Sequence, residues 1–196
     1  MLLQRRVGQD CVSFGATMAG RPAELAGIEQ QIGLFINTLP VIVPCTAGQA
    51  LGDWLDDLQA LNLRIREHEH TPLLDIQRWA GQGGDALFDS LLVFENYPVA
   101  EALERGSPSG LRFGPVRTQE QSNYPLTLVV GLENNLSLRC SYDRQAFSAA
   151  IIEQIGQQLR HLLLQMLEHG AQVPVEALQL LDDQQRQVAL QALSLI

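Results

Sequence analysis

Two strand-like runs followed at once by a long amphipathic helix constrain the fold of this chain most strongly. Residues Leu126–Leu132 and Leu136–Tyr142 flank Glu133-Asn134-Asn135, which predicts a β-hairpin. From about Gln145 to Glu168 the apolar residues repeat every 3.6 positions, which predicts a helix. Its predicted buried face consists of Phe147, Ile151, Ile155, Leu159, Leu162 and Met166. A hairpin that leads directly into such a helix indicates a sheet with helices packed against it.

The first half of the chain alternates strand and helix signals in the same way. Cys11–Ala19 alternates apolar and small residues, and Phe88–Phe94 is a nearly continuous apolar run, so both are expected to be strands. The predicted elements between them are a strand from Gly33 to Val43 with Pro40 at a sheet edge, a helix opened by a capping box at Thr46–Gln49, and a helix from Pro72 to Ala80. Residues 97–121 are irregular and rich in Gly and Pro. The sequence therefore predicts an α/β fold with a mixed β-sheet flanked by helices.

Composition excludes several classes of function. All 13 basic residues are arginines and the formal net charge is -9, which argues against nucleic acid and against an anionic membrane surface. No apolar run is long enough for a membrane-spanning helix, and the N-terminal residues do not resemble a signal peptide. The 3 cysteines are far apart, so neither a disulfide framework nor a zinc site is expected. We expect a cytoplasmic protein with incidental free thiols.

Side chains that carry chemistry are few and scattered. The 4 histidines are His68, His70, His161 and His169, and no two are adjacent. The His68–His70 spacing offers no third metal ligand nearby, so no metal site is expected. Ser141 and Ser148 have no histidine or acid at a suggestive spacing, and residues 82–85 lack the Lys of a phosphate loop. The sequence predicts no catalytic residue of its own.

Three stretches, in the expected order, resemble motifs of nonribosomal peptide synthetase condensation domains. The first and most specific is Ile32-Gly33-Leu34-Phe35-Ile36-Asn37-Thr38, preceded by Gly20-Arg21-Pro22. His68-Glu69-His70-Thr71-Pro72 resembles a His/Asn-Gln-x-Tyr-Pro motif, with Glu69 in place of Gln and Thr71 in place of the aromatic residue. The third is Leu87-Phe88-Asp89 with Val93-Phe94, in a motif that has lost its arginines. The family's paired-histidine motif, His-His-x-x-x-Asp-Gly, is nowhere in the sequence.

The resemblance implies one lobe of a two-lobed fold similar to chloramphenicol acetyltransferase. In that family a tunnel runs between the lobes, and the catalytic histidine lies in the N-terminal lobe. We therefore expect residues 1–183 to be a C-terminal lobe, truncated at its N-terminus, and residues 184–196 to begin a linker or tail. A fragment without the facing lobe is expected to be inactive alone, because general-base work needs a group within hydrogen-bond reach of the reacting amine. Whether it counts as an enzyme therefore stays open.

Carried over from the family motif, Gly33, Phe35, Asn37 and Thr38 are expected to line the tunnel. A short amide such as Asn37 could orient a thioester carbonyl or an amine by hydrogen bonds. The other interpretation is that Asn37 satisfies backbone groups where two segments cross, and that Gly33 only permits a turn. Arg21 is expected to hold the structural crossover by pairing with a carboxylate.

The resemblance also implies the partners. Full-length relatives join acyl or peptidyl and aminoacyl thioesters by amide bond formation, so the partners are carrier protein domains and the missing N-terminal lobe. The cofactor is the phosphopantetheine arm of the carrier protein, and none is expected to be bound directly. A weaker expectation is a subtype that joins two L-configured residues, as in siderophore lipopeptide assembly. The alternative is a non-catalytic interaction module that binds a carrier protein or a separately encoded N-terminal lobe; a self-sufficient homodimeric acyltransferase is disfavoured.

Overall fold

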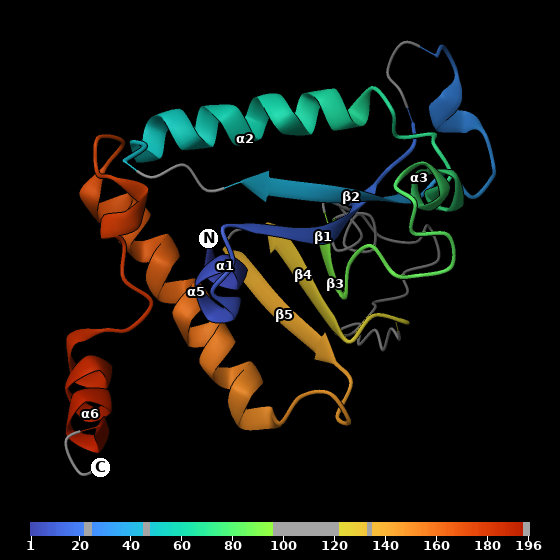
Figure 1. Ribbon diagram of the computed structural model, residues 1–196. Helices are drawn as coiled ribbons and strands as arrows, with labels where there is room; N and C mark the ends of the chain where they lie inside the picture. The colour runs from blue at the N-terminus through green and yellow to red at the C-terminus, as the bar shows by residue number, and fades with distance from the viewer. Residues whose placement is uncertain (22–24, 45–47, 96–121, 133–134, 194–196) are drawn as a thin grey trace, which may run out of the picture.

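In the computed structural model, which describes residues 1–21, 25–44, 48–95, 122–132 and 135–193, the strands form one mixed sheet (Figure 1). The strand order is β2-β1-β3-β4-β5. The central β1–β3 and β3–β4 pairs are parallel, and the outer pairs, β1–β2 and β4–β5, are antiparallel. The bounds are β1 Cys11–Met18, β2 Asn37–Pro44, β3 Ser90–Glu95, β4 Leu126–Leu132 and β5 Leu136–Tyr142. This arrangement confirms the predicted α/β class with mixed strand directions.

Helices pack against both edge strands of the sheet. Helices α2 and α3 contact β2, whereas α5 contacts β5 and α1 contacts β1 (Figure 1). The bounds are α1 Leu2–Val7, η1 Ile28–Gln30, α2 Leu51–Arg66, α3 Leu73–Trp79, α5 Ala149–His169, η2 Val175–Ala177 and α6 Asp183–Leu193. The predicted tail therefore begins inside α6. None of the described helices has the length and apolar character needed to cross a bilayer.

Local sequence signals explain the hairpin and the helix after it. The hairpin strands have the predicted bounds. Helix α5 begins at Ala149 rather than near Gln145, because the Ser148 hydroxyl accepts the Ile151 N–H and caps the helix there. Its buried face is also turned relative to the prediction: Ile152 is buried, whereas Ile151 is exposed. The buried set includes Gln158 and Gln165, which a search for apolar spacing leaves out.

Helix α2 begins in a way that the sequence did not indicate. Its N-cap is Ala50, which supplies no side-chain hydrogen bond, so the predicted capping box at Thr46–Gln49 is wrong. Two of the N–H groups that a helix start leaves unpaired are instead bound by carbonyls from a distant part of the chain. Leu51 donates to Val173 and Gly52 donates to Ala171, both at 2.8 Å.

The predicted second strand is shorter than expected. The ladder begins at Asn37 instead of Gly33, because residues 33–36 have no partner in the described part of β1. The edge position of the strand and its Pro40 is confirmed. The predicted irregular stretch, residues 97–121, falls outside the part of the chain described here.

Two apolar clusters lie in the core: the first joins α2, α5 and η2 to one another, and the second packs α5 against β4. Leu51, Leu162, Val175 and Leu178 form one, and Leu126, Ile152 and Ile155 form the other. Leu2 of α1 packs against both. Trp54 packs against the first cluster, whereas Trp79 is 75% exposed.

Candidate functional site

The residues expected to form the site lie in the segment that joins β1 to β2 and in the first two residues of β2. This segment is closed at its base by Gly20 and Phe35, which touch through their backbones. Gly20 has φ of 64°, and a Cβ atom there would lie 1.8 Å from the Phe35 carbonyl oxygen. Only glycine combines this conformation with this approach. The close crossing fixes where the loop leaves the sheet and where it returns.

Arg21 braces the same loop from inside. Its Nη1 donates to the Ile28 carbonyl at 2.5 Å, and Nη1 and Nη2 both lie 3.2 Å from the Gln31 carbonyl oxygen. The guanidinium carbon lies 4.3 Å from the centre of the Phe35 ring, within cation–π range. The expected carboxylate partner is not among the contacts described for Arg21; inward-facing carbonyls and an aromatic ring take that place.

The outer surface of the loop is apolar and fully open. Ile32 is 104% exposed and Leu34 is 92% exposed. Gly33 lies between them, and a Cβ atom there would come within 3.0 Å of the Phe35 ring. Phe35 thus turns inward onto Arg21 while its apolar neighbours turn outward. A loop braced internally with two leucine-sized side chains in water has the character of an interaction surface.

Asn37, the first residue of β2, makes three hydrogen bonds within the fold. Its Nδ2 donates to the carbonyls of Glu69 and Thr71, each at 2.8 Å, and its Oδ1 accepts the Thr38 N–H at 2.9 Å. Both amide hydrogens are therefore used to fasten the turn between α2 and α3 to the start of β2. This geometry favours the interpretation in which Asn37 satisfies backbone groups where two segments cross. A contact of Asn37 or Thr38 with a substrate remains a prediction.

The turn that Asn37 holds contains the second family-like motif. Glu69, which stands where the motif has Gln, is only 6% exposed, while His68 and His70 are exposed on either side of it. Across the described residues no cluster of three His, Cys, Asp or Glu side chains is placed to hold a metal ion. Nor does any hydrogen bond in that part of the chain join a histidine ring to a serine, cysteine or carboxylate.

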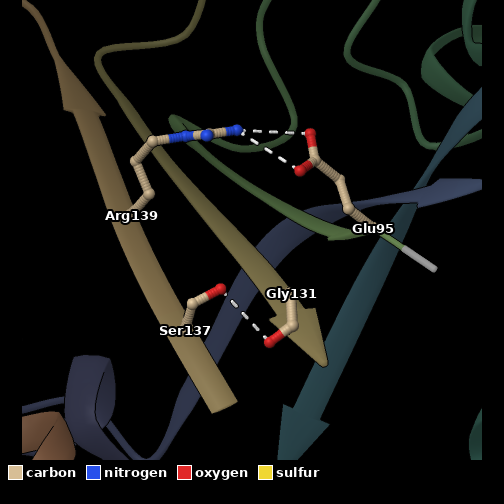
Figure 2. Close-up of polar contacts among 4 residues, drawn as sticks. All are labelled: Glu95, Gly131, Ser137 and Arg139. Atoms are coloured by element: carbon tan, nitrogen blue, oxygen red, sulfur yellow. Dashed lines mark hydrogen bonds and ion pairs between the residues drawn. The ribbon is translucent and has the colours of Figure 1, made fainter. Parts of the chain in front are cut away.

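A second polar group lies on the sheet and was not predicted. Arg139 on β5 reaches across to Glu95 at the end of β3, with Nη2 3.3 Å from each carboxylate oxygen (Figure 2). Gly131 of β4 lies between the two strands and is paired with both Glu95 and Ser137. The Ser137 hydroxyl donates to the Gly131 carbonyl at 3.3 Å. The alternation of Ser137, Arg139 and Ser141 along β5 was the one sequence signal for a polar face here.

Among the residues that the structure describes, two groups have a shifted pKa. Burial raises the pKa of the Cys140 thiol and that of the Tyr124 hydroxyl. Tyr124 also stacks on Phe88, with ring centres 5.2 Å apart. A raised thiol pKa is the opposite of what an activated nucleophile needs. The described residues thus supply a braced apolar loop, a turn held by Asn37 and an ion pair on the sheet.

Comparison with known proteins shows the family to which the sequence is similar. The family model for the condensation domain matches residues 1–190. A linear gramicidin synthase of Brevibacillus parabrevis is 41% identical over 191 residues, and surfactin synthase subunit 3 of Bacillus subtilis (strain 168) is 34% identical over 195 residues. These matches cover 97% and 99% of the chain but only 4% and 15% of the two relatives, so the chain spans a small part of each.

Solved structures with the same fold are less similar in sequence. Holo-AB3403, a four-domain nonribosomal peptide synthetase bound to AMP and glycine, superposes with a TM-score of 0.77 at 19% identity, covering 93% of this chain and 15% of that one. The starter condensation domain of rhizomide synthetase RzmA gives a TM-score of 0.66 at 19% identity. There the match covers 92% of this chain and 43% of that chain.

Proposed function

Because the chain belongs to the condensation domain family, we propose that it forms the C-terminal lobe of a nonribosomal peptide synthetase condensation domain. The complete domain would join a donor acyl or peptidyl thioester to an acceptor aminoacyl thioester, with an amide bond as the product. Attack of the neutral acceptor amine on the donor thioester forms the C–N bond and breaks the C–S bond, and the proton that the amine loses ends on the departing thiolate of the donor carrier. Moving this proton needs a base within hydrogen-bond reach, and the family's paired-histidine motif is absent from this sequence.

One observation carries the proposal: Ile32 and Leu34 are exposed on a loop whose base is locked. Leaving two such side chains in water costs about 1.5–3 kcal/mol each relative to burial. Gly20 and Arg21 hold the loop in one shape, so its apolar surface is prepared before any partner arrives, and preorganisation lowers the entropic cost of binding. A facing lobe that covers this loop would turn the exposed side chains into a buried contact.

The roles of the individual residues follow from their positions. Phe35 lies partly buried beneath that apolar surface, Gly33 lies exposed between Ile32 and Leu34, and β2 begins at Asn37 and Thr38. We propose that these residues form the wall that this lobe contributes to the tunnel, and that Arg21 supports it. Phosphopantetheine arms of two carrier proteins would bring the reacting groups to the wall. The chain alone would not catalyse, because the paired-histidine motif is absent from its sequence.

A second candidate function has an observation of its own. A groove of about 490 Å³ lies between β2, the end of α2 and α3. Its wall is mainly apolar and includes Leu39, Ile65, Ile76 and the exposed Trp79. A non-catalytic module that docks a carrier protein or a separately encoded N-terminal lobe could use this groove. The two functions differ in whether amide product forms once the facing lobe is supplied.

The test is reconstitution. The chain is mixed with the N-terminal part of the matching condensation domain from the Brevibacillus linear gramicidin synthase, made as a separate polypeptide, and with loaded donor and acceptor carrier proteins. Mass spectrometry should find amide product in the mixture and none above background with the chain alone. Binding without product would favour the non-catalytic module, and product from the chain alone would contradict the proposed inactivity.

Matched variants test whether the loop with Ile32 and Leu34 contacts the facing lobe. Ile32→Ser with Leu34→Ser should reduce product formation about tenfold or more, because two apolar anchors of the contact are lost. Leu74→Ser is the control, since Leu74 is 67% exposed on α3, outside the loop. Equal loss in both variants would contradict the role of the loop.

A further inference from the structure

The two edges of the sheet differ in how much unpaired backbone they offer. An edge strand presents a row of N–H and C=O groups that can pair with another strand, and proteins usually block such rows. Strands β2 and β5 are the two edges of the sheet in the described residues, and β5 forms its free margin beside α5 (Figure 1). The direction of the N–H and C=O groups along each edge strand decides how many of them can pair with a further strand.

On β2, the hydrogen bonds of Gln4 show which way the backbone groups point. Its Nε2 donates to the carbonyls of Asp10, at 3.1 Å, and Val43, at 2.9 Å. One nitrogen can reach both oxygens only if both point into the space between β1 and β2. In an antiparallel pair, the backbone N–H and C=O groups of successive residues point alternately toward the partner strand and away from it. The backbone groups of Val41 and Val43 therefore point toward β1. The residues that face outward are Thr38, Pro40, Ile42 and Pro44.

Three of the four N–H positions in this outward row are blocked. Pro40 and Pro44 have no N–H, as suits an exposed edge. The Thr38 N–H is bound by the Asn37 side chain at 2.9 Å. Ile42 thus has the one outward N–H of β2 for which the described residues provide no acceptor. Pairing of a further strand along β2 would find a single donor in four positions.

On β5 the direction is set by one bond beyond the hairpin. The Asp143 N–H donates to the Pro125 carbonyl at 2.9 Å, which extends the β4–β5 ladder by one pair. By the same alternation, the backbone N–H and C=O groups of Ser141, Arg139 and Ser137 point toward β4. The outward residues are Leu136, Leu138, Cys140 and Tyr142. None is proline, and no side chain in the described part of the molecule is bonded to their backbone.

The side chains of β5 define what could pair with it. Cys140 and Tyr142 pack toward α5, and Leu136 on the same face remains 51% exposed. On the opposite face, the Arg139 charge is held by Glu95 and so does little to repel an added strand. A strand with apolar residues on the α5 side and polar residues on the other would continue both faces of the sheet.

From these features we propose that the outer edge of β5 receives a sixth strand, supplied by the part of the condensation domain that this chain does not span. The inference rests on the proposed function. The chain covers 43% of the RzmA starter domain, so such a domain holds ample further polypeptide. Within the described residues the β5 edge keeps the N–H groups of four outward residues, whereas the β2 edge keeps one such N–H, that of Ile42. A second copy of this chain and an unrelated peptide are the competing occupants.

Hydrogen exchange tests the proposal residue by residue. The ¹⁵N-labelled chain is measured alone and with the separately made N-terminal part of the linear gramicidin synthase domain. Alone, the outward amides of β5 should exchange fast while Ser137, Arg139 and Ser141 are protected. In the mixture, the amides of Leu138 and Cys140 should exchange about tenfold slower or more, since each gains a hydrogen bond.

A matched pair of proline variants separates this contact from general damage. Cys140→Pro removes one outward N–H from β5, and Ile42→Pro removes one from β2; neither position donates within the sheet. The first should weaken association about tenfold and the second should leave it unchanged. Circular dichroism establishes that both variants fold, and the exchange data on the unmodified chain stand if either does not.

Each other outcome overturns the inference. Amide product without slowed exchange on β5 rejects the sixth strand and leaves the proposed function intact. Slow exchange in the chain alone that grows with its concentration assigns the edge to a second copy. Loss of both association and product rejects the proposed function together with this inference.

Discussion

The Asn37 side-chain nitrogen lies 2.8 Å from the Thr71 carbonyl oxygen, which ties the first residue of β2 to the turn before α3. The same nitrogen binds the Glu69 carbonyl, and the amide oxygen binds the Thr38 N–H. One short side chain thus makes hydrogen bonds to three backbone groups from two segments. A motif residue that resembles a tunnel-lining position therefore has a mechanical task of its own.

Asn37→Ala should lower the free energy of unfolding by about 2–4 kcal/mol, because three hydrogen bonds are lost and the turn carbonyls lose their donor. Urea denaturation measures the change. Asn62→Ala on the exposed side of α2 is the matched control and should change stability by less than about 0.5 kcal/mol. A similar value for both variants would show that the clamp contributes nothing.

Gly20→Ala should destabilise the chain far more than Gly81→Ala. Both glycines have positive φ, 64° and 71°, so both variants carry the left-handed penalty of about 1–2 kcal/mol. A methyl at Gly20 would also meet the Phe35 carbonyl, whereas at Gly81 nothing lies within 4 Å. The additional loss at Gly20 should be about 1–3 kcal/mol in thermal or urea unfolding. If the two variants were equally stable, the crossing of Gly20 and Phe35 would not be tight in solution.

The Cys140 thiol gives the protein a pH dependence on the alkaline side. Burial raises its pKa above the ordinary value of 9.0, so the thiolate forms more readily in the unfolded chain. Stability from this group is full below that value and is lost as the pH rises through it toward the higher folded-state pKa. The melting temperature of the unmodified chain should therefore fall more steeply than that of Cys140→Ala above about pH 9.

Alkylation provides a second check on the same thiol. Iodoacetamide should modify the exposed Cys11 before Cys140 when peptides are counted by mass spectrometry. Faster labelling of Cys140 would contradict its burial.

The Glu95–Arg139 pair should contribute little to stability. Its side chains are 32% and 54% exposed, and exposed ion pairs typically contribute about 0–1 kcal/mol. A double-mutant cycle with Glu95→Gln and Arg139→Gln should give a coupling below about 1 kcal/mol that shrinks with added salt. A coupling of several kcal/mol that ignores salt would instead indicate a pair sealed from water.

Local patterns predicted the parts of the fold that local forces decide. The hairpin at Leu126–Tyr142 has the expected bounds because two strand-like runs flank turn residues that lie close together in the sequence. The start of β2 was placed too early, since Ile32 to Ile36 are apolar enough for a strand but have no partner in the ladder. The α2 cap could not be found, because its acceptors, Val173 and Ala171, lie more than a hundred positions away.

The candidate site followed the same division. The sequence located the loop and Asn37 through a family motif, and the comparisons confirm the family and the fold class. It did not reveal that Arg21 stacks on Phe35, because such a contact depends on how the loop folds back. The pairing of Glu95 with Arg139 depends on strand order, which no short pattern records.

The carbonyls of Val173 and Ala171 that cap α2 also bear on how the chain is made. Synthesis proceeds from the N-terminus, so Leu51 and Gly52 leave the ribosome long before their acceptors exist. Until the segment from Ala171 to Leu178 has emerged, the N–H groups of Leu51 and Gly52 lack their acceptors, and the apolar cluster lacks Val175 and Leu178. The β2 side of the sheet would thus wait, unfinished, for residues made more than a hundred positions later, and a ribosome that stalled before Leu178 would hold a lobe with its first long helix unanchored.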